Sequence, residues 1–197
     1  MSELTTFYFV RHGESEANAA RRFAGQSDSP LTPRGRRQAE TVAAELAKVK
    51  FDRIVSSDLS RTRETAEAIA KRQGVGVEVI RELREIDVGE RTGTPFDEAR
   101  GLPNWSDDGF VAWPGGETLD AVLARTLGAI DRLTRESPGK TILVVGHGGI
   151  NRILLSHFLG ILPKLDRSPA TNTNISVVHT DGKAHTVERL FAADHVG

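Results

Sequence analysis

Short β-type segments alternate along this chain with stretches of helical periodicity, and this alternation constrains the fold more than any other feature. The predicted strands are Thr6–Val10, Arg53–Val55, Val75–Ile80, Thr141–Val145, Ile175–His179 and His185–Leu190. Strands separated by helices form βαβ units, which produce a mostly parallel sheet with helices on both faces. The sequence therefore predicts an α/β fold with three layers, an α/β/α sandwich.

Four helices are predicted between these strands, each with a starting signal in the sequence. The first begins after Thr32, where a proline occupies the first helical position. Asp58 can cap the second helix, which ends near Gly74, and Thr118 can cap the third. The fourth follows Gly149. Apolar residues recur in these helices at spacings of three and four, so one face of each is expected to be buried.

The last two predicted strands are joined by Thr180–Lys183, and the Asp-Gly pair at its centre is a hairpin signal. One edge of the sheet is therefore expected to be antiparallel. The chain has 197 residues, of which 38% are hydrophobic, and this is enough to bury a sizeable core in one domain. We predict a single domain over residues 1–197.

The segment Gly89–Glu117 fits this pattern poorly. It contains six glycines, three prolines and both tryptophans of the chain, together with acidic residues such as Asp97 and Asp107. A connection of this length inside a compact domain usually serves a function. Two interpretations stay open: the segment covers a binding site, or it is a surface excursion in which Trp105 and Trp113 form a small core of their own.

Charge and composition exclude several classes of function. The 26 basic and 27 acidic side chains leave a formal charge of -1, so no overall field attracts nucleic acid or an anionic membrane. The absence of cysteine excludes disulfides, thiolate metal sites and thiol catalysis. The first residues lack a signal-peptide pattern, and no run of about 18 apolar residues occurs. We expect a cytoplasmic protein that binds neither nucleic acid nor membrane.

Polar groups of one kind follow four of the predicted strands. They are Arg11, His12 and Asn18 after the first, Ser56, Ser57, Asp58 and Arg61 after the second, Glu82 and Glu85 after the third, and His147, Gly148 and Gly149 after the fourth. Parallel strands bring their carboxyl ends to one edge of the sheet, so we expect these groups to converge. Arginines, histidines and amides at a helix N-terminus suit a tetrahedral dianion such as phosphate. A carboxylate beside that dianion is most useful as a proton carrier.

Four blocks of the sequence together resemble the histidine phosphatase superfamily, the phosphoglycerate mutase-like enzymes. These blocks are Phe9–Asn18 with its Arg-His-Gly, Phe23–Thr32, Ser56–Ala66, and Val145–Gly149. They occur in the family's order at compatible spacings, and the resemblance runs from about residue 6 to residue 190. It implies a six-stranded sheet with one antiparallel strand, which agrees with the six strands predicted from the residues.

The resemblance also implies a role for individual residues. His12 is the implied nucleophile that forms a phosphohistidine, and Glu85 the implied donor of a proton to the leaving oxygen and then the base that activates water. The groups implied to hold the phosphoryl oxygens are Arg11, Asn18, Arg61, His147 and the Gly148 amide. No metal and no cofactor is implied. The residues expected to contact the rest of the substrate are Phe23, Gly25, Gln26 and Trp113.

The residues by themselves leave some roles open. Glu82 and Asp87 are rivals to Glu85 for the proton transfer, and without the resemblance the three are nearly equal candidates. Arg63 lies two residues after Arg61 on a predicted helix, so its side chain points elsewhere. The histidines not expected to be catalytic are His157, His179, His185 and His195. No His-x-x-x-His or His-x-His pair occurs, which argues against a metal site.

The choice between phosphatase and mutase rests on two departures from the mutases of the superfamily. Those enzymes have Arg-His-Tyr after the catalytic Glu, where this chain has Ile86-Asp87-Val88, and they carry basic insertions where the segment Gly89–Glu117 is acidic. We therefore predict a phosphomonoesterase that acts on a small phosphorylated metabolite through a phosphohistidine. The alternatives are a cofactor-dependent phosphoglycerate mutase, a phosphoprotein phosphatase, and a module that binds a phosphate ligand without catalysis.

Overall fold

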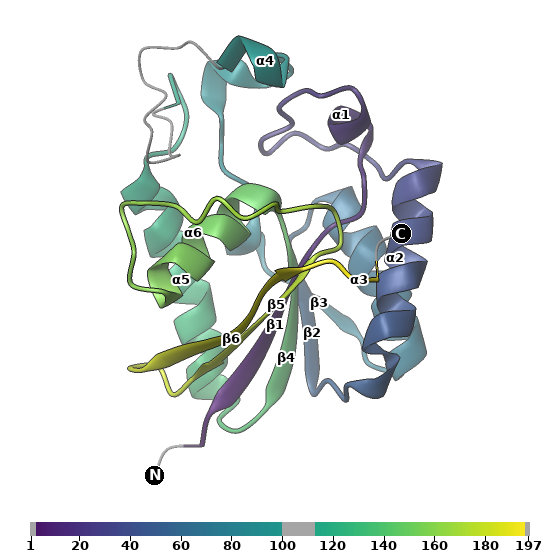
Figure 1. Cartoon of the computed structure of the whole chain (residues 1–197), viewed down its shortest axis with the longest axis vertical. Coiled ribbons are helices and arrows are strands. Elements are labelled where there is room, and N and C mark those ends of the chain that lie inside the picture. Colours follow the sequence, from purple (N-terminus) through teal and green to yellow (C-terminus); the bar gives the residue numbers. More distant parts are fainter. Residues whose placement is uncertain (1–2, 100–112, 196–197) are drawn as a thin grey trace.

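A six-stranded sheet runs through the centre of the protein (Figure 1). The structure, a computed structural model, describes residues 3–99 and 113–195. The strands are β1 (Thr5–Arg11), β2 (Arg53–Ser56), β3 (Val77–Val79), β4 (Thr141–Gly146), β5 (Ile175–Thr180) and β6 (His185–Ala192), in the order β3-β2-β4-β1-β5-β6. The pairs β3–β2, β2–β4 and β4–β1 are parallel, whereas β5 is antiparallel to both of its neighbours. The predicted mixed sheet with one antiparallel strand is confirmed.

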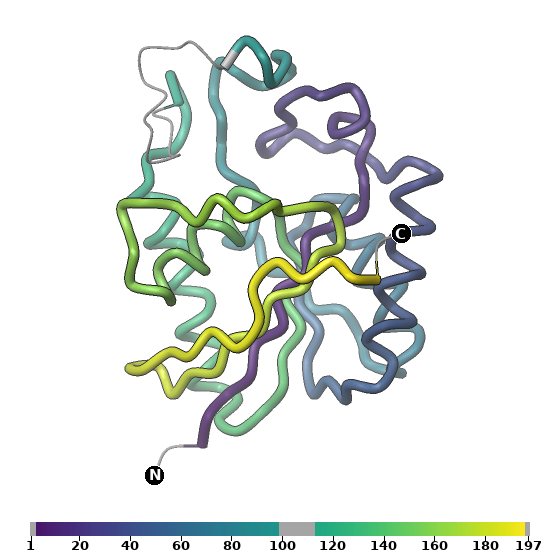
Figure 2. The backbone as a smooth tube through the Cα atoms, viewed as in Figure 1, coloured from purple at the N-terminus to yellow at the C-terminus, as the bar shows by residue number. Residues whose placement is uncertain are grey.

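Helices cover both faces of this sheet, as Figures 1 and 2 show. They are α1 (Glu16–Ala19), α2 (Pro33–Glu45), α3 (Ser60–Gln73), α4 (Phe96–Ala99), α5 (Leu119–Glu136) and α6 (Gly148–Phe158). Alternate residues of β1 point to opposite faces. Phe7 and Phe9 are buried in one apolar cluster with residues of α5 and α6, whereas Val10 lies in a second cluster with residues of α2 and α3. Two cores separated by the sheet make the predicted three-layer sandwich.

The starts of α2 and α5 agree with the predicted caps, whereas the start of α3 does not. The side chains of Thr32 and Thr118 accept hydrogen bonds from amides in the first turns of α2 and α5. The predicted cap at Asp58 is wrong, because α3 begins after Leu59 with no side-chain cap. Asp58 instead accepts two hydrogen bonds from Arg84, at 2.7 and 2.6 Å. This two-bond pair with a charged donor stabilises the carboxylate more than a single bond from a backbone amide would.

Two other boundaries differ from the sequence prediction. Strand β3 spans only three residues, because the chain turns at Ile80 into a short 3-10 helix, Arg81–Leu83. The helix expected to follow Gly149 begins two residues earlier, at Gly148, with His147 in the capping position. The amides of the first turn of α6 are therefore placed directly after the carboxyl end of β4, where polar groups are expected to converge.

A close approach of two backbones shapes the start of this region. Gly13 follows β1, and a Cβ atom there would collide with the backbone of Gly35 in the first turn of α2. A Cβ atom at Gly35 would in turn collide with the backbone of Glu14. Only glycine at these two positions lets the loop after His12 lie against α2.

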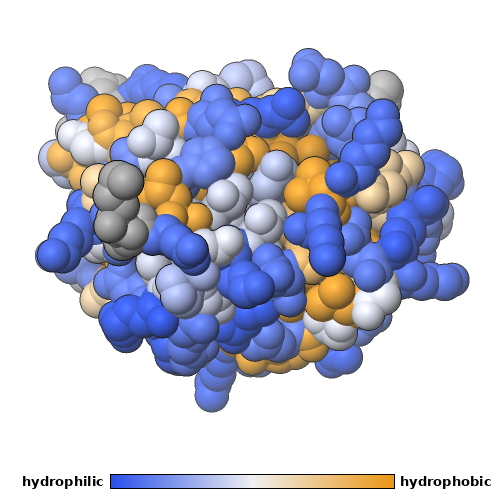
Figure 3. Space-filling view, turned by 90° about the horizontal axis from the view of Figure 1, so that it is seen from below, coloured by the Kyte–Doolittle hydropathy of each residue, from blue (hydrophilic) through white to orange (hydrophobic). Residues whose placement is uncertain are grey.

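At the end of the molecule away from the carboxyl ends of β1 and β4, hydrophobic residues form small patches separated by hydrophilic ones (Figure 3). Within residues 3–99 and 113–195, no helix combines the length and the apolar character needed to cross a membrane.

Candidate active site

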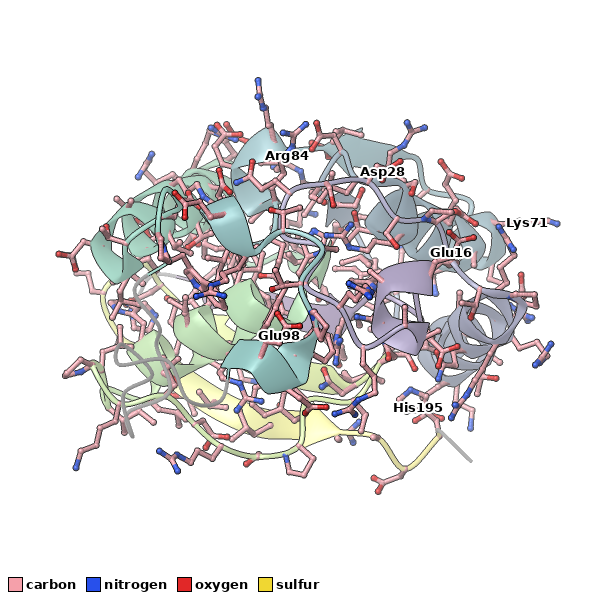
Figure 4. The ribbon with its side chains drawn as sticks, turned by 90° about the horizontal axis from the view of Figure 1, so that it is seen from above. Glu16, Asp28, Lys71, Arg84, Glu98 and His195 are labelled. Atoms are coloured by element: carbon pink, nitrogen blue, oxygen red, sulfur yellow. The ribbon has the colours of Figure 1, made fainter. Side chains whose placement is uncertain are left out.

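A cavity of about 330 Å³ opens at the carboxyl ends of β1 and β4. The predicted site residues that line it are Arg11, His12, Asn18, Phe23, Gly25, Arg61, Glu85, Trp113 and Gly148. Figure 4 looks onto this end of the molecule, with Glu98 of α4 near the middle of the view and Arg84 and His195 toward opposite margins. The segments that carry these residues are far apart in the sequence, and the sheet topology brings them to one place, as the strand-end argument predicts.

The ring of His12 is buried and held in one tautomer. Its Nδ1 lies 2.6 Å from the carbonyl oxygen of Gly13, which can only accept, so Nδ1 carries the proton and Nε2 has a free lone pair. Burial lowers the pKa of His12 well below its ordinary value, and the positive charges of Arg61 and Arg11 lower it further. The site therefore holds a neutral imidazole between cations, which is the state that a nitrogen nucleophile requires.

His147 lies next to His12, with 5.3 Å between the ring centroids, but it does not line the cavity. Nε of Arg61 donates to Nδ1 of His147 at 3.2 Å, and Nε2 of His147 lies 2.8 Å from the hydroxyl oxygen of Ser57. Because Nδ1 accepts, the proton of the neutral ring is on Nε2 and points to Ser57. Burial lowers the pKa of His147 well below its ordinary value, with Arg61 as the next cause. In this structure His147 orients Arg61.

Two arginines, the buried Arg61 and the partly buried Arg11, supply positive charge at the cavity. Arg61 is only 2% exposed, and its terminal nitrogens donate to the carbonyls of Ser27 at 2.9 Å and Gly25 at 2.8 Å. Arg11 donates through Nη1 to the carbonyl of Ala170, while its buried Nε has no partner among the described residues. Burial lowers the pKa of both groups. Guanidinium groups removed from water and not paired with a carboxylate favour an anionic ligand.

The Glu85 carboxylate lies at the N-terminus of α6. Its Oε2 accepts from the Gly149 amide at 3.0 Å, and its Oε1 accepts from the amides of Ile150 at 3.2 Å and Ile86 at 2.9 Å. The first-turn amides of a helix are free to bind such an anion. Gly149 has to be glycine, because a Cβ atom there would lie 2.5 Å from Glu85 Oε1.

The two rival carboxylates lie elsewhere. Glu82 forms an exposed ion pair with Arg132 at 3.4 Å, and Asp87 Oδ1 accepts from the Gly89 amide at 2.9 Å. Among the three acidic candidates only Glu85 lines the cavity.

Aromatic rings form the wall of the cavity on the side of the segment Gly89–Glu117. The ring of Phe23 lies 4.8 Å from that of Phe96 and 5.2 Å from that of Trp113, centroid to centroid. Phe96 and Trp113, from the described parts of the segment, therefore line the cavity, and the cover stays a prediction. Trp105 lies outside the described residues, and so does the expectation of a small core made by the two tryptophans.

Gln26 is the predicted substrate contact that the structure does not bring to the cavity. It lies in a second hollow with Arg125, and its side chain bonds to Glu117.

Several residues at the site were not predicted from the sequence. Arg22 and Arg152 line the cavity, and Asn172 donates to the His12 carbonyl at 3.0 Å and to Asn18 Oδ1 at 3.2 Å. Arg152 lies three residues after Gly149, which is one turn along α6, and this spacing could have pointed to it. Asn172 comes from a loop after α6 that carries no motif, so the sequence offered no signal for it.

The residues that the sequence analysis did not expect at the site do not line the cavity in the described part of the chain. Arg63 pairs with Glu67 one helical turn further on, at 3.4 Å. The cavity lining also leaves out the four histidines that were not expected to be catalytic, His157, His179, His185 and His195. In the described ranges, no group of three or more histidine, aspartate or glutamate side chains could hold a metal ion.

The model of the histidine phosphatase superfamily (branch 1) matches residues 7–193. The chain belongs to this superfamily. A probable phosphoglycerate mutase of Cronobacter sakazakii, GpmB, is 42% identical to it over 164 residues, which are 78% of this chain and 74% of that protein.

Solved structures of the superfamily have the same fold. YhfR of Bacillus stearothermophilus superimposes with a TM-score of 0.89 at 30% identity, covering 98% of this chain and 100% of that one. A mycobacterial glucosyl-3-phosphoglycerate phosphatase gives 0.86 at 27% identity, covering 96% and 100%. The similar proteins therefore bear the names of both phosphatases and mutases.

Proposed function

We propose that this member of the histidine phosphatase superfamily is a phosphomonoesterase that hydrolyses a small phosphate ester through a phosphohistidine at His12. The observation that carries the proposal is the His12 tautomer: Nδ1 donates to the Gly13 carbonyl, so the lone pair of Nε2 is available beside the buried Arg61 and the partly buried Arg11. No metal or cofactor takes part in the proposed reaction, because the arginines stabilise the charge on the transferring phosphoryl group.

In the first step the Nε2 lone pair of His12 attacks phosphorus, and the bond from phosphorus to the ester oxygen breaks. The leaving oxygen takes a proton from the carboxyl group of Glu85, and the alcohol departs. Arg11 and Arg61, with Asn18 and the Gly148 amide, bind the phosphoryl oxygens, while His147 contributes by holding Arg61. Burial of these groups strengthens their interaction with the developing charge.

In the second step Glu85, now a carboxylate, takes a proton from a water molecule, and the water oxygen attacks phosphorus. The bond between phosphorus and Nε2 breaks, and the ring of His12 returns to its neutral form with the proton still on Nδ1. Inorganic phosphate is released. One carboxyl group thus serves as acid and then as base, and the difficult displacement is divided into two easier ones.

Hydrolysis is favoured over mutase chemistry by the residues that follow Glu85. Ile86 and Val88 line the cavity, as do the aromatic rings of Phe23 and Trp113. An apolar wall suits the body of an alcohol leaving group, whereas a mutase has to bind a carboxylate next to the hydroxyl that it phosphorylates.

The mutase stays the second candidate because of two further cations. Arg22 and Arg152 line the same cavity, and the relative from C. sakazakii is named as a probable mutase. Both arginines already donate to backbone carbonyls, Arg22 to that of Gly93 at 2.6 Å and Arg152 to that of Ser168 at 3.1 Å. A substrate carboxylate would have to displace these bonds.

The test is a rapid quench with labelled substrate, combined with a screen of phosphorylated metabolites and an assay of 3-phosphoglycerate isomerisation. We expect phosphate release and a phosphoenzyme that is stable in alkali and labile in acid. His12→Ala should abolish the phosphoenzyme, whereas His179→Ala, a histidine on β5 remote from the cavity lining, should leave it unchanged. A phosphoenzyme that persists in His12→Ala would refute the nucleophile. Isomerisation faster than phosphate release would identify a mutase, and binding without turnover would identify the non-catalytic module.

A second comparison tests the proton donor. An alkoxide leaving group needs a proton far more than a nitrophenolate does. Single-turnover phosphoenzyme formation by Glu85→Gln should therefore fall by about two to four orders of magnitude with alkyl phosphates and by distinctly less with p-nitrophenyl phosphate. A larger difference between the two substrates in Glu82→Gln or Asp87→Asn would mean that the acid is a neighbour of Glu85.

A further inference from the structure

Arg125, on the second turn of α5, uses every hydrogen-bond donor that it has. Its Nε and one Nη2 proton bond to the two carboxylate oxygens of Glu117, at 2.6 and 2.8 Å. The other three donors bond to backbone carbonyls, at distances from 2.6 to 3.0 Å. A guanidinium has five N–H groups, so none is left for solvent or substrate.

The three carbonyls that Arg125 binds belong to Glu82, Arg84 and Glu85. They lie on the chain that leads from the 3-10 helix into the cavity, and the last belongs to the proposed proton donor itself. This stretch forms no strand or α-helix, and Arg125 supplies the hydrogen-bond partner of these three carbonyls. The guanidinium therefore fixes the backbone on which the Glu85 side chain is mounted.

Glu117 extends this arrangement to the other side of Glu85. Its Oε2 also accepts from the Asp87 amide at 2.8 Å, and its own amide donates to the Asp87 carbonyl at 2.9 Å. Both bonds are made by the backbone of Asp87, so they fix the chain just after Glu85, as Arg125 fixes the chain before it. The Gly116 amide donates to the Trp113 carbonyl at 2.9 Å, so Glu117 also follows directly on the turn that carries the aromatic wall.

We propose that Arg125 is a positioning residue for Glu85. Together with Glu117 it fixes the backbone before and after Glu85 by hydrogen bonds, so that the Glu85 carboxyl group stays at the cavity beside the turn that carries Trp113. The inference rests on the proposed function, in which Glu85 transfers the proton. Arg125 does not line the cavity, so it acts through Glu85 and not on the substrate.

This role differs from that of an ordinary ion pair. The Arg125 and Glu117 side chains are 19% and 20% exposed, whereas most ion pairs among the described residues have at least one partner that is far more exposed. Three of the five bonds join a charged donor to a backbone carbonyl, and such bonds have a fixed direction. A lysine would bring the charge but not the planar fork that reaches these carbonyls together.

The experiment compares Arg125→Gln with Arg132→Gln, which removes the same charge two turns further along α5 from an exposed pair with Glu82. Single-turnover phosphoenzyme formation is measured with an alkyl phosphate and with p-nitrophenyl phosphate. A misplacement of about 1 Å can cost about 100-fold in rate, so we expect Arg125→Gln to lose roughly 10- to 100-fold with the alkyl ester. The loss with the nitrophenyl ester should be under about 3-fold, because that leaving group hardly needs the acid. Arg132→Gln should match the wild type with both.

A double variant separates positioning from general weakening of the fold. Because Arg125 acts through Glu85, adding Arg125→Gln to Glu85→Gln should cause little further loss with the alkyl ester. Glu117→Gln, which keeps the shape of the side chain, should also lose more rate with the alkyl ester than with the nitrophenyl ester, although both losses should be smaller. It serves as the test if Arg125→Gln does not fold.

The outcomes distinguish this inference from the proposed function. Equal losses with both esters, or additive losses in the double variant, would overturn the positioning role while leaving the phosphatase intact. Absence of a phosphoenzyme in the wild type would overturn the proposed function itself.

Discussion

The glycine at position 149 offers a direct test of how closely Glu85, the proposed proton donor, is held. An alanine Cβ there would lie 2.5 Å from Glu85 Oε1 and 2.7 Å from the Ile86 side chain, whereas ordinary contacts begin at 3.4 Å. The Glu85 carboxylate would therefore have to retreat by about 0.9 Å, the difference between 3.4 and 2.5 Å. Such a shift stretches its bonds to the Gly149 and Ile150 amides, which are already 3.0 and 3.2 Å long.

A displacement of that size has a predictable effect on the rate. Misplacing a catalytic group by about 1 Å can cost about 100-fold, so Gly149→Ala should slow phosphoenzyme formation from alkyl phosphates by about that factor. With p-nitrophenyl phosphate we expect a loss of only a few-fold, since its leaving group needs little protonation. Gly128→Ala is the matched control, because a Cβ at Gly128 on α5 meets nothing within 4 Å. It should raise stability by roughly 0.5–1 kcal/mol and leave both rates unchanged.

The assay is single-turnover quench with both esters, accompanied by urea unfolding of each variant. A Gly149→Ala enzyme that loses the two activities equally, while remaining folded, would show that the carboxylate near Gly149 is not the proton donor. An enzyme with no loss at all would show that the contact relaxes without moving Glu85.

Three further predictions concern the same site. The pKa values of His12 and His147 are lowered in the folded protein, so the unfolded chain binds more protons below about pH 6.5. As the pH is lowered from about 6.5 to 5, the free energy of unfolding should therefore decrease by up to about 1.4 kcal/mol per pH unit for each ring. A free energy of unfolding in urea that does not change over that range would contradict the neutral buried rings. Phosphatase activity should survive exhaustive chelation, and activity restored by one divalent metal would overturn a mechanism based on arginine. Trp113→Ala should reorder the specificity constants of alcohol leaving groups while a phosphoenzyme still forms, and an unchanged order would remove the indole from the substrate site.

Much of the fold could be predicted because the central strands of the sheet are buried on both faces. Strand β4 is apolar at successive positions, and the buried residues alternate between the two cores, Ile142 and Val144 to one and Leu143 and Val145 to the other. In a chain of alternating strands and helices, a short continuous apolar run of this kind is typical of a central strand of a parallel sheet. The short edge strand β3 was overestimated, because a strand with an exposed face, such as Val79 at 51% exposure, carries a weaker pattern.

The residues of the candidate site could be predicted where they belong to a sequence motif. They could not be predicted where only the direction of a side chain in the fold brings them to the cavity. His12 and Arg61 follow strands in recognisable blocks, whereas the choice of Glu85 over Glu82 and Asp87 depended on the family resemblance. The structure separates the three by direction, since only Glu85 reaches the amides of Gly149 and Ile150. Three acidic residues so close together look alike in a sequence, and the 3-10 helix that contains Glu82 and ends before Glu85 has no strong signal of its own.

The N-terminus of α6 links the two halves of the proposed reaction. Its second and third amides, those of Gly149 and Ile150, hold the Glu85 carboxylate, while Gly148 lies under the Arg11 guanidinium, with a Cβ position 3.3 Å from Nε. One helix end can therefore serve the phosphoryl group and the proton carrier together. In the proposed reaction Glu85 gives its proton to the leaving oxygen, and the amides that would stabilise the new carboxylate are already in place, so no reorganisation is needed at that moment. The contacts require glycine at 149, where a Cβ atom would lie 2.5 Å from Glu85 Oε1, whereas a Cβ atom at 148 would meet only the flexible Arg11 side chain, at 3.3 Å or more.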